Sequence, residues 1–286
     1  MLIAGPTASG KSALAVSWAV AMGGAVINTD SMQVYRDLRI LSARPSVEDE
    51  GLAPHLLYGH VSAQESYSLG RFRDDAAAAL AEAQGRGLIP IFTGGTGMYF
   101  AALTEGVAAV PPIPDEVRIA AREKLAAIGV AALHAELAAM DPLTAAVLRP
   151  SDPQRVLRAY EVFVATGRPL ADWQKQNLPP VLTGLRLAKV VVDPPRDVLR
   201  ERIATRFRQM MDMGAAAEAE TLRGIDPALP AAKVLGLREL WAIADGRLCR
   251  EEGVDLAITA TRQFAKRQVT WTRNRMADWQ RISLTS

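Results

Sequence analysis

The chain has 286 residues, of which 49% are hydrophobic and 22% are charged, and it carries a formal net charge of +2. This length and composition allow a sizeable core in one large or two modest domains. The single cysteine, Cys249, excludes an internal disulfide framework and a cysteine-rich zinc site. No stretch has the apolar length of a membrane-spanning helix, and the first residues lack the pattern of a secretory signal, so we expect a cytoplasmic protein without a membrane partner. Nothing in the sequence demands more than a monomer.

The first predicted element is a short apolar strand at 2–4, which leads into a glycine-rich loop. Residues 5–12 match the phosphate-binding pattern G-x-x-x-x-G-K-[ST], the ATP-binding motif of many nucleotide-binding proteins. A predicted helix at 12–22 ends at Gly23-Gly24, so its N-terminus faces the phosphate. We predict that a polyphosphate binds to the loop residues Gly5, Pro6, Thr7, Ala8, Ser9, Gly10, Lys11 and Ser12, the alternative being a chance glycine turn.

Two residues of this loop have distinct predicted roles. Lys11 reaches the terminal phosphates, and the Ser12 hydroxyl is a ligand for Mg²⁺, the cofactor that this pattern implies. The loop alone does not specify which polyphosphate it binds.

Three further apolar runs, at 25–28, 88–93 and 187–192, alternate with helical sequence. They predict an α/β fold with a P-loop-type parallel sheet flanked by helices. Because ligands of open parallel sheets bind beyond the carboxyl ends of the strands, the residues that follow each run should converge beside the phosphate loop. These residues are Thr29-Asp30-Ser31, Gly94-Gly95-Thr96-Gly97 and Asp193.

Asp30 is the most informative of these residues. An acid after a buried strand of a P-loop protein can coordinate Mg²⁺, act as a general base or cap a helix. Thr96, at the tip of a glycine turn, can donate a hydrogen bond to a substrate.

The chain changes character between Glu105 and about Leu182, where it becomes alanine-rich and helical between proline-rich joints. We predict an inserted all-helical subdomain at 111–182 within a catalytic core made of 1–110 and 183–286. The alternative is a set of extra helices that cover the same core.

Basic residues are concentrated in two predicted helices. Arg202 and Arg206 lie one turn apart beside an apolar stripe, where a guanidinium can reach an anion or form a structural salt bridge. Residues 262–275 contain several basic residues and no acid. A helical projection puts Arg262, Lys266 and Arg273 opposite Ala257, Ala260, Phe264 and Trp271, so the basic face should meet a phosphate backbone or be simply solvated.

Five blocks of this sequence resemble the tRNA dimethylallyltransferases, also called tRNA isopentenyltransferases. Besides the phosphate loop they read Asp-Ser-Met-Gln-Val-Tyr at 30–35, Gly-Gly-Thr-Gly-Met-Tyr at 94–99, Asp-Pro-Gln-Arg-Val-Leu-Arg-Ala at 152–159 and Thr-Arg-Gln-Phe-Ala-Lys-Arg-Gln-Val-Thr-Trp at 261–271. The blocks follow the family's order and span most of the chain. Leu237 stands where the family usually has tyrosine, and the single cysteine leaves no zinc finger, which points to a bacterial-type enzyme.

The resemblance implies transfer of a dimethylallyl group from dimethylallyl diphosphate to N6 of the adenosine 3′ to the anticodon of tRNA. Asp30 is then the general base, with Thr96 and Lys11 in the catalytic group, and Arg206 joins the loop in binding diphosphate. The anticodon stem-loop is the implied RNA partner. Its implied contacts are Asp30, Ser31, Met32, Gln33, Thr96, Arg118, Gln154, Arg155, Val156, Leu157, Arg158, Arg262, Lys266 and Arg267, with Tyr35, Tyr99 and Trp271 as stacking candidates or core residues.

Other functions remain open from the residues alone. A P-loop kinase or NTPase would use Asp30 or Asp193 as its Mg²⁺ carboxylate. A prenyltransferase could act on free adenylate, although the basic helix argues against it. A nonenzymatic RNA-binding protein would have no need of Lys11, Ser12, Asp30 and Thr96 together.

Overall fold

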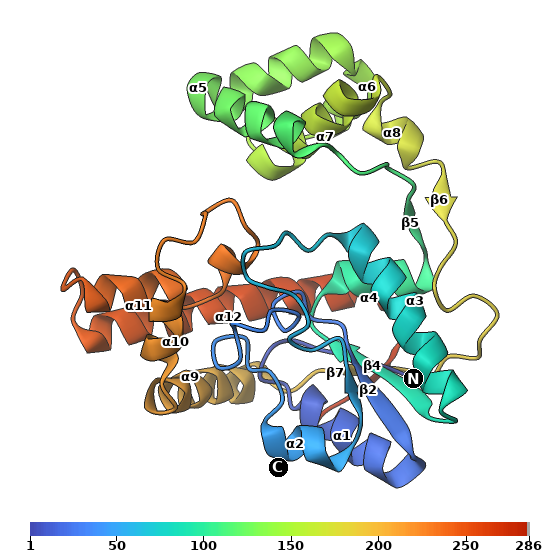
Figure 1. Ribbon diagram of the computed structural model, residues 1–286, viewed down its shortest axis with the longest axis vertical. Helices are drawn as coiled ribbons and strands as arrows, with labels where there is room; N and C mark the ends of the chain where they lie inside the picture. The colour runs from blue at the N-terminus through green and yellow to red at the C-terminus, as the bar shows by residue number, and fades with distance from the viewer. Residues whose placement is uncertain (285–286) are drawn as a thin grey trace. The chain divides into compact units, whose positions relative to one another are not determined.

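The computed structural model describes residues 1–284, and the chain divides into two compact units. The larger unit comprises Met1–Thr104 together with the chain from Val181 onward, and the smaller unit is Glu105–Pro180 (Figure 1). Among the described residues, no helix is both long enough and apolar enough to cross a membrane.

The larger unit is built on a six-stranded sheet in which every pairing is parallel, with the strand order β3-β2-β4-β1-β7-β8. Strand β1 lies between β4 and β7, so the loop that follows it starts in the middle of the sheet. The predicted parallel sheet is confirmed. Its strands are β1 (Leu2–Ala4), β2 (Gly24–Asn28), β3 (His55–Leu56), β4 (Ile89–Gly94), β7 (Lys189–Val192) and β8 (Gln280–Ile282).

Helices cover both faces of this sheet. Figure 1 shows α1 and α2 on one side of the strands and α3 and α4 on the other, as right-handed crossovers require. Ala15, Val16 and Ala19 of α1 pack on Ile3 and Ile91 of the sheet. The helices of this unit are α1 (Lys11–Met22), α2 (Val47–Leu52), α3 (Leu69–Gly85), α4 (Gly97–Thr104), α9 (Arg196–Asp212), α10 (Ala215–Thr221), α11 (Leu237–Ala244) and α12 (Arg250–Arg275).

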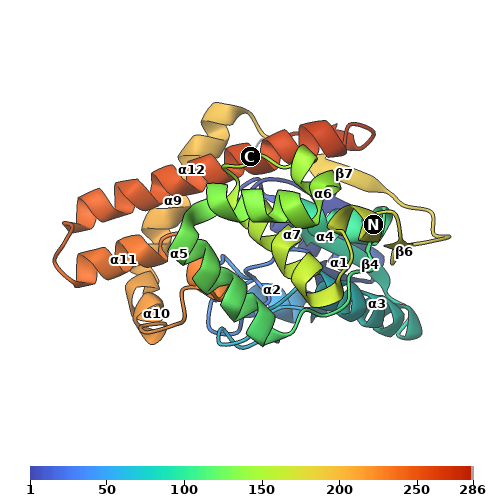
Figure 2. The ribbon, with the colours of Figure 1, turned by 90° about the horizontal axis from the view of Figure 1, so that it is seen from above.

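The long helix α12 packs against α9 and α11; in Figure 2, α11 runs alongside α12 and α9 crosses it. Its buried line consists of Gly253, Val254, Ala257, Ile258, Thr261, Ala265, Gln268 and Thr272. The predicted apolar face is therefore confirmed only in part: Ala257 is fully buried, whereas Ala260, Phe264 and Trp271 lie beside the buried line and are only partly covered. Small and polar residues occupy the buried line instead. Thr261 can be buried because its hydroxyl donates to the Ala257 carbonyl of its own helix, at 2.8 Å, and so needs no other partner.

The smaller unit has its own core but is not all-helical, which corrects the prediction. Val107–Ala108 (β5) and Asn177–Leu178 (β6) form an antiparallel pair where the chain enters and leaves the unit. The two segments run side by side, so pairing satisfies their backbone groups. The helices are α5 (Asp115–Met140), α6 (Pro142–Val147), α7 (Pro153–Thr166) and α8 (Leu170–Trp173), and the core contains Ala121, Leu133, Leu137, Ala145, Val156, Ala159 and Tyr160.

Candidate active site

The loop between β1 and α1 folds into a tight turn that ends at the N-terminus of α1. Gly10, with φ of 91°, caps the helix in the left-handed region, and Ala8 has a φ of 63° despite its side chain. A Cβ at Gly5 would lie 2.8 Å from the Val192 carbonyl oxygen, so β7 leaves room only for glycine there. Strain and close packing of this kind are typical of a loop that holds an anion against a helix N-terminus.

A cavity of about 1070 Å³ opens over this loop. Its wall combines the loop and α1 with residues from the end of β2 and from α9. The lining residues are Thr7, Ala8, Ser9, Gly10, Lys11, Ser12, Ala13, Leu14, Ser17, Asp30, Gln33, Ser42, Ala43, Val198, Glu201, Arg202, Thr205, Arg206, Gln209 and Leu284. One cavity therefore brings together the predicted base Asp30, Arg206 and the predicted diphosphate-binding residues from Thr7 to Ser12.

Two cations face the carboxylate of Asp30. The Lys11 side chain is only 8% exposed and donates to the Pro6 carbonyl at 3.3 Å. Burial lowers the pKa of Lys11 to about 8, Asp30 opposes this shift, and Arg206 adds to it. Burial also lowers the pKa of Arg206, to about 10, against the attraction of Asp30. With two desolvated cations and one carboxylate, these charges favour the binding of an anion in the cavity.

The structure distinguishes between the two arginines of α9. Arg206 donates from Nη2 to the Thr7 hydroxyl, and its charge interacts with Asp30 and Lys11. Arg202 donates to the backbone carbonyls of Ser9, at 3.5 Å, and Leu284, at 3.1 Å. Arg202 and Arg206 both line the cavity; Arg202 is bonded to backbone carbonyls, and the charge of Arg206 interacts with Asp30 and Lys11.

Asp30 is held by a buried asparagine at the end of β2. Asn28 is fully buried, accepts from the Asp30 N–H at 2.7 Å, and donates to the carbonyls of Asp30, at 2.9 Å, and Leu57, at 3.0 Å. The Met32 N–H donates to Asp30 Oδ1 at 2.9 Å, and no described residue donates to Oδ2. Asp30 is followed by turns and no α-helix, so it does not act as a helix cap. One carboxylate oxygen is therefore fixed by the turn, and the other has no hydrogen bond to a described residue.

Thr96 lies beside this turn. Its hydroxyl accepts from the Ser31 N–H at 3.0 Å and donates to Ser31 Oγ at 3.3 Å. A Cβ at Gly94 would lie 2.2 Å from the Thr29 carbonyl carbon, so only glycine lets β4 end this close to β2. The predicted convergence of the two strand ends is thus present in the structure.

Asp193, at the end of β7, does not join this group. Its carboxylate accepts from Arg281 of β8 at 2.8 Å, and it lines a different cavity. The expected convergence of Asp193 beside the phosphate loop was therefore wrong, because an ion pair within the sheet occupies its side chain.

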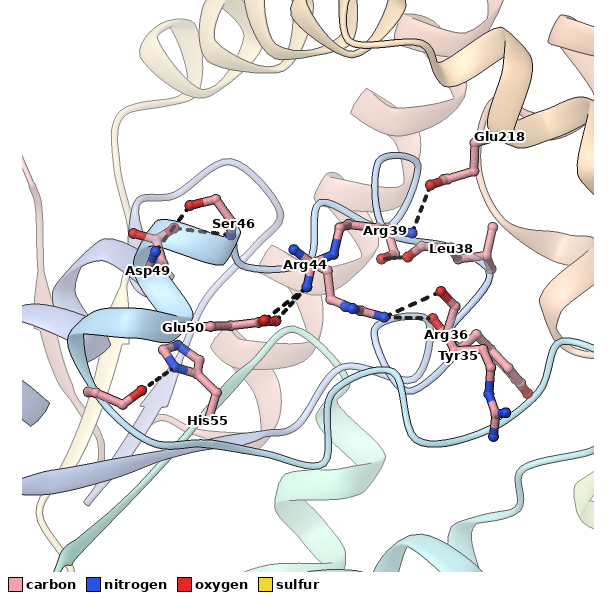
Figure 3. A network of polar contacts seen from close by, with 12 residues as sticks. Tyr35, Arg36, Leu38, Arg39, Arg44, Ser46, Asp49, Glu50, His55 and Glu218 are labelled. Atoms are coloured by element: carbon pink, nitrogen blue, oxygen red, sulfur yellow. Dashed lines mark hydrogen bonds and ion pairs between the residues drawn. The ribbon is translucent and has the colours of Figure 1, made fainter.

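Ser42 and Ala43 in the wall of the cavity belong to a loop whose backbone is hydrogen-bonded to α10. Glu218 accepts three backbone N–H groups, from Arg39 at 2.8 Å, Ile40 at 2.7 Å and Leu41 at 2.7 Å. Figure 3 shows Glu218 reaching the backbone of Arg39, whose guanidinium turns the other way to Glu50, at 2.9 Å to each oxygen. The sequence offered no signal for Glu218, since an acid in a short helix is normally solvated.

The side chain of Gln33 also holds this loop, at the two residues that line the cavity. Its side chain is 9% exposed, and its amide nitrogen donates to the carbonyls of Ser42, at 3.0 Å, and Ala43, at 2.8 Å. Of the residues predicted to contact tRNA here, Ser31 and Met32 are partly exposed, whereas the amide of Gln33 supports the wall. Tyr35 is fully buried, and Tyr99 stacks on Phe72 with ring centroids 3.7 Å apart, so both are core residues.

The basic residues of α12 divide between its two sides. Arg262, Lys266 and Arg273 line a second cavity of about 380 Å³ against α9, where Arg262 donates to the Arg200 carbonyl at 3.4 Å. Arg267 lies over the Phe264 ring, 5.5 Å from its centroid.

Trp271 packs so closely on Gly97 that a Cβ there would lie 2.1 Å from the indole nitrogen. Trp271 therefore supports the turn that carries Thr96.

The basic residues of the smaller unit are paired with acids nearby in sequence. Arg118 lies 3.9 Å from Asp115, Arg155 lies 3.5 Å from Asp152, and Arg158 lies 3.6 Å from Glu161. Burial lowers the pKa of Arg158, and the charge of Arg118 adds to this effect against that of Glu161. Arg118 and Arg158 thus contribute to one positive region of this unit.

Three neighbours in the same block of α7 differ in exposure. Gln154 is exposed, whereas the Val156 side chain is fully buried in the core of the unit, and Leu157 packs against that core. The prediction that Val156 contacts tRNA was therefore wrong for its side chain. The apolar stripe of α7 needs this residue for packing.

The central parallel sheet flanked by helices defines a protein of the α/β class, and the loop between β1 and α1 matches the phosphate-binding sequence pattern. The chain belongs to the IPP transferase family, whose model matches residues 33–275. A second model, described as isopentenyl transferase, matches residues 1–53.

The relatives carry consistent names. A tRNA dimethylallyltransferase of Bradyrhizobium sp. (strain ORS 278) is 51% identical over 99% of this chain and 92% of its own length. Among solved structures, the tRNA isopentenylpyrophosphate transferase of Bacillus halodurans is similar with a TM-score of 0.68 and 33% identity, over 99% of this chain and 88% of that one. A eukaryotic dimethylallyltransferase acting on tRNA is similar with a TM-score of 0.81 and 27% identity, over 99% and 73%.

Proposed function

We infer that this chain is a tRNA dimethylallyltransferase. It transfers a dimethylallyl group from dimethylallyl diphosphate to N6 of the adenosine 3′ to the anticodon of tRNA, and so forms N6-dimethylallyladenosine. The observation that carries this function is the meeting of Asp30 with Lys11, Arg206 and the phosphate loop in one cavity. The family supports the same reading.

The phosphate loop would bind a leaving group. As the C–O bond to the allylic carbon breaks, its electron pair leaves with the diphosphate, whose growing negative charge must be stabilised. Lys11 is a buried cation and Arg206 a partly buried one beside the loop, so water screens their charges less than it would at the surface. They would stabilise the leaving diphosphate while the loop holds it at the N-terminus of α1.

Asp30 would accept the proton of the acceptor. The exocyclic amine of adenine is a poor nucleophile, and its lone pair forms the new C–N bond as a proton leaves N6. With Oδ1 fixed by the Met32 N–H, Oδ2 is the oxygen in position to take that proton. The Thr96 hydroxyl, held by Ser31, would orient the substrate beside it.

We propose Mg²⁺ as the cofactor. No group of three or more His, Cys, Asp or Glu side chains in residues 1–284 could hold a metal ion, so the chain has no all-protein metal site in this part. The residues fit Mg²⁺ as a partner of the diphosphate, because Ser12 and Asp30 line the same cavity and Mg²⁺ binds through few protein ligands plus phosphates and water. When bound, Mg²⁺ would neutralise charge on the leaving group.

The basic residues of the smaller unit and of α12 would anchor the anticodon stem-loop. Arg118, Arg155 and Arg158 in the smaller unit, and Arg262, Lys266 and Arg267 on α12, offer cations to phosphates on surfaces that are at least partly exposed. An adenosine alkylated at N6 must leave its stack, which anchored neighbouring phosphates make possible. We propose that one chain suffices as a cytoplasmic monomer, since it supplies every residue named here.

The proposed function is tested by incubating the protein with Mg²⁺, labelled dimethylallyl diphosphate and unmodified tRNA, then digesting the RNA and identifying its nucleosides by mass. We expect N6-dimethylallyladenosine from the position 3′ to the anticodon. Parallel reactions contain free adenylate, or ATP without prenyl donor. Product on free adenylate alone, or turnover of ATP without prenyl transfer by folded protein, would contradict the proposal.

A further inference from the structure

Gln268 on α12 joins the two loops that form the active site. Its side-chain oxygen accepts from the Thr7 N–H of the phosphate loop at 2.8 Å. Its side-chain nitrogen donates to the Gly95 carbonyl, in the turn that carries Thr96, at 3.0 Å. The residue is 6% exposed, and it spans 261 positions of sequence to Thr7 and 173 to Gly95. A single amide thus bridges the donor and acceptor sides of the site.

The hydrogen bond from the Thr7 N–H to Gln268 removes this N–H from the loop groups that can bind an anion. The Thr7 N–H is occupied by Gln268, so the anion is held by the other loop amides and by Lys11. The Thr7 hydroxyl in turn accepts from Arg206. Gln268 therefore fixes the residue on which the position of the Arg206 guanidinium depends.

The bond to Gly95 acts on the acceptor side. A Cβ at Gly95 would lie 2.2 Å from the Gln268 amide nitrogen, so the turn and the side chain are in direct contact. The next residue is Thr96, whose backbone N–H donates to the Thr29 carbonyl at 3.2 Å and whose hydroxyl is bonded to Ser31. Displacing Gly95 would shift Thr96 relative to Asp30.

We propose that Gln268 is a positioning residue that holds the phosphate loop and the Gly94–Gly97 turn in register, so that the diphosphate and the acceptor amine meet in reactive geometry. The inference rests on the proposed transfer reaction and adds a residue that touches neither reactant. A displacement of this kind affects the chemical step more than the affinity for either substrate alone.

The test compares Gln268→Met, which keeps the side-chain length but forms neither bond, with Gln263→Met on an exposed position of the same helix. We measure single-turnover transfer at saturating donor and tRNA, tRNA affinity, and pyrophosphate affinity. For Gln268→Met we expect transfer roughly tenfold to a hundredfold slower, from the loss of two buried hydrogen bonds, with tRNA affinity within about twofold of the parent. Gln263→Met should match the parent in transfer rate and in pyrophosphate affinity.

A double-mutant cycle separates positioning from general destabilisation. Gly95→Ala attacks the same bridge from its other end, so it should slow transfer similarly, and the double variant should be no slower than the slower single variant. Should Gln268→Met fail to fold, Gln268→Glu replaces it in the cycle, because a carboxylate still accepts from Thr7 but cannot donate to Gly95. An unchanged rate in the folded variant, or additive effects of the two substitutions, would overturn the proposal. An inactive parent protein would instead contradict the proposed function.

Discussion

Under the proposed function, the phosphate-loop cavity and the basic surface of Glu105–Pro180 would bind anions by different physical means. Lys11 in the cavity wall, and Asn28 and Gln268 behind it, are buried and bonded to backbone groups. In the smaller unit, Arg118, Arg155 and Arg158 lie beside acids three residues away in sequence. The first region is organised before its ligand arrives, and the second contributes mainly charge. Substitutions in the cavity should therefore affect chemistry strongly, whereas those on the basic surface should affect affinity in small, salt-dependent steps.

Asp30→Asn should have the largest effect. Asparagine can still accept from the Met32 N–H, so the turn is preserved, but it cannot take a proton. We expect the single-turnover rate to fall by roughly 10²–10⁴-fold, the usual contribution of a general base, with little change in tRNA or pyrophosphate affinity. Unchanged transfer, measured with bound tRNA, would remove Asp30 from the role of base.

Glu218→Ala tests whether the cavity wall is fixed from α10. It leaves three backbone N–H groups without their acceptor, so we expect a loss of about 2–3 kcal/mol in the free energy of unfolding and slower transfer. Glu220→Ala on the same helix is the matched control, because its exposed ion pair with Arg223 contributes less than about 1 kcal/mol. Equal losses in urea unfolding of the two variants would argue against a clamp.

The pH dependence of pyrophosphate binding should report Lys11. In the free protein its pKa lies at about 8, and a bound anion favours the charged form, so binding takes up a proton above that pH. Affinity should fall above about pH 8, by at most about tenfold per pH unit. Lys11→Met is the control for ionisation of pyrophosphate itself. This variant binds pyrophosphate more weakly, but its affinity lacks the pH dependence that Lys11 contributes. The same slope in both proteins would show that Lys11 does not titrate in this range.

Arg262→Ala and Lys266→Ala should have the smallest effects. Each removes one cation from the α12 surface, so each should weaken tRNA binding modestly and reduce the slope of log affinity against log salt by about 1 or less. Arg273→Ala, in the same groove but outside the predicted contact set, is a useful comparison. A loss that does not depend on salt would indicate a structural role for the residue.

The site residues that could be predicted from the sequence lie in a short contiguous motif or directly after a strand. The phosphate loop is a contiguous pattern, and Asp30 and Thr96 follow strands that apolar runs identify. Their arrangement in space could then be inferred from the rule that parallel strands end at one edge.

The supporting residues could not be found in this way. Gln268 and Glu218 bond to backbone groups 261 and 179 positions away, and no local pattern encodes such contacts. The buried line of α12 was misjudged because hydropathy treats Thr261 and Gln268 as surface residues, whereas their hydrogen bonds let them be buried. Strands β3 and β8 are short and contain no fully buried residue, so they leave no apolar run to detect.

The division of labour between the two regions is tested most directly by measuring pyrophosphate and tRNA affinities in two variants, Lys11→Met and the double variant Arg155→Ala/Arg158→Ala. We expect Lys11→Met to lose pyrophosphate affinity and keep tRNA affinity, and we expect the reverse for the double arginine variant. Loss of both affinities in both variants, with each protein shown to be folded, would contradict it.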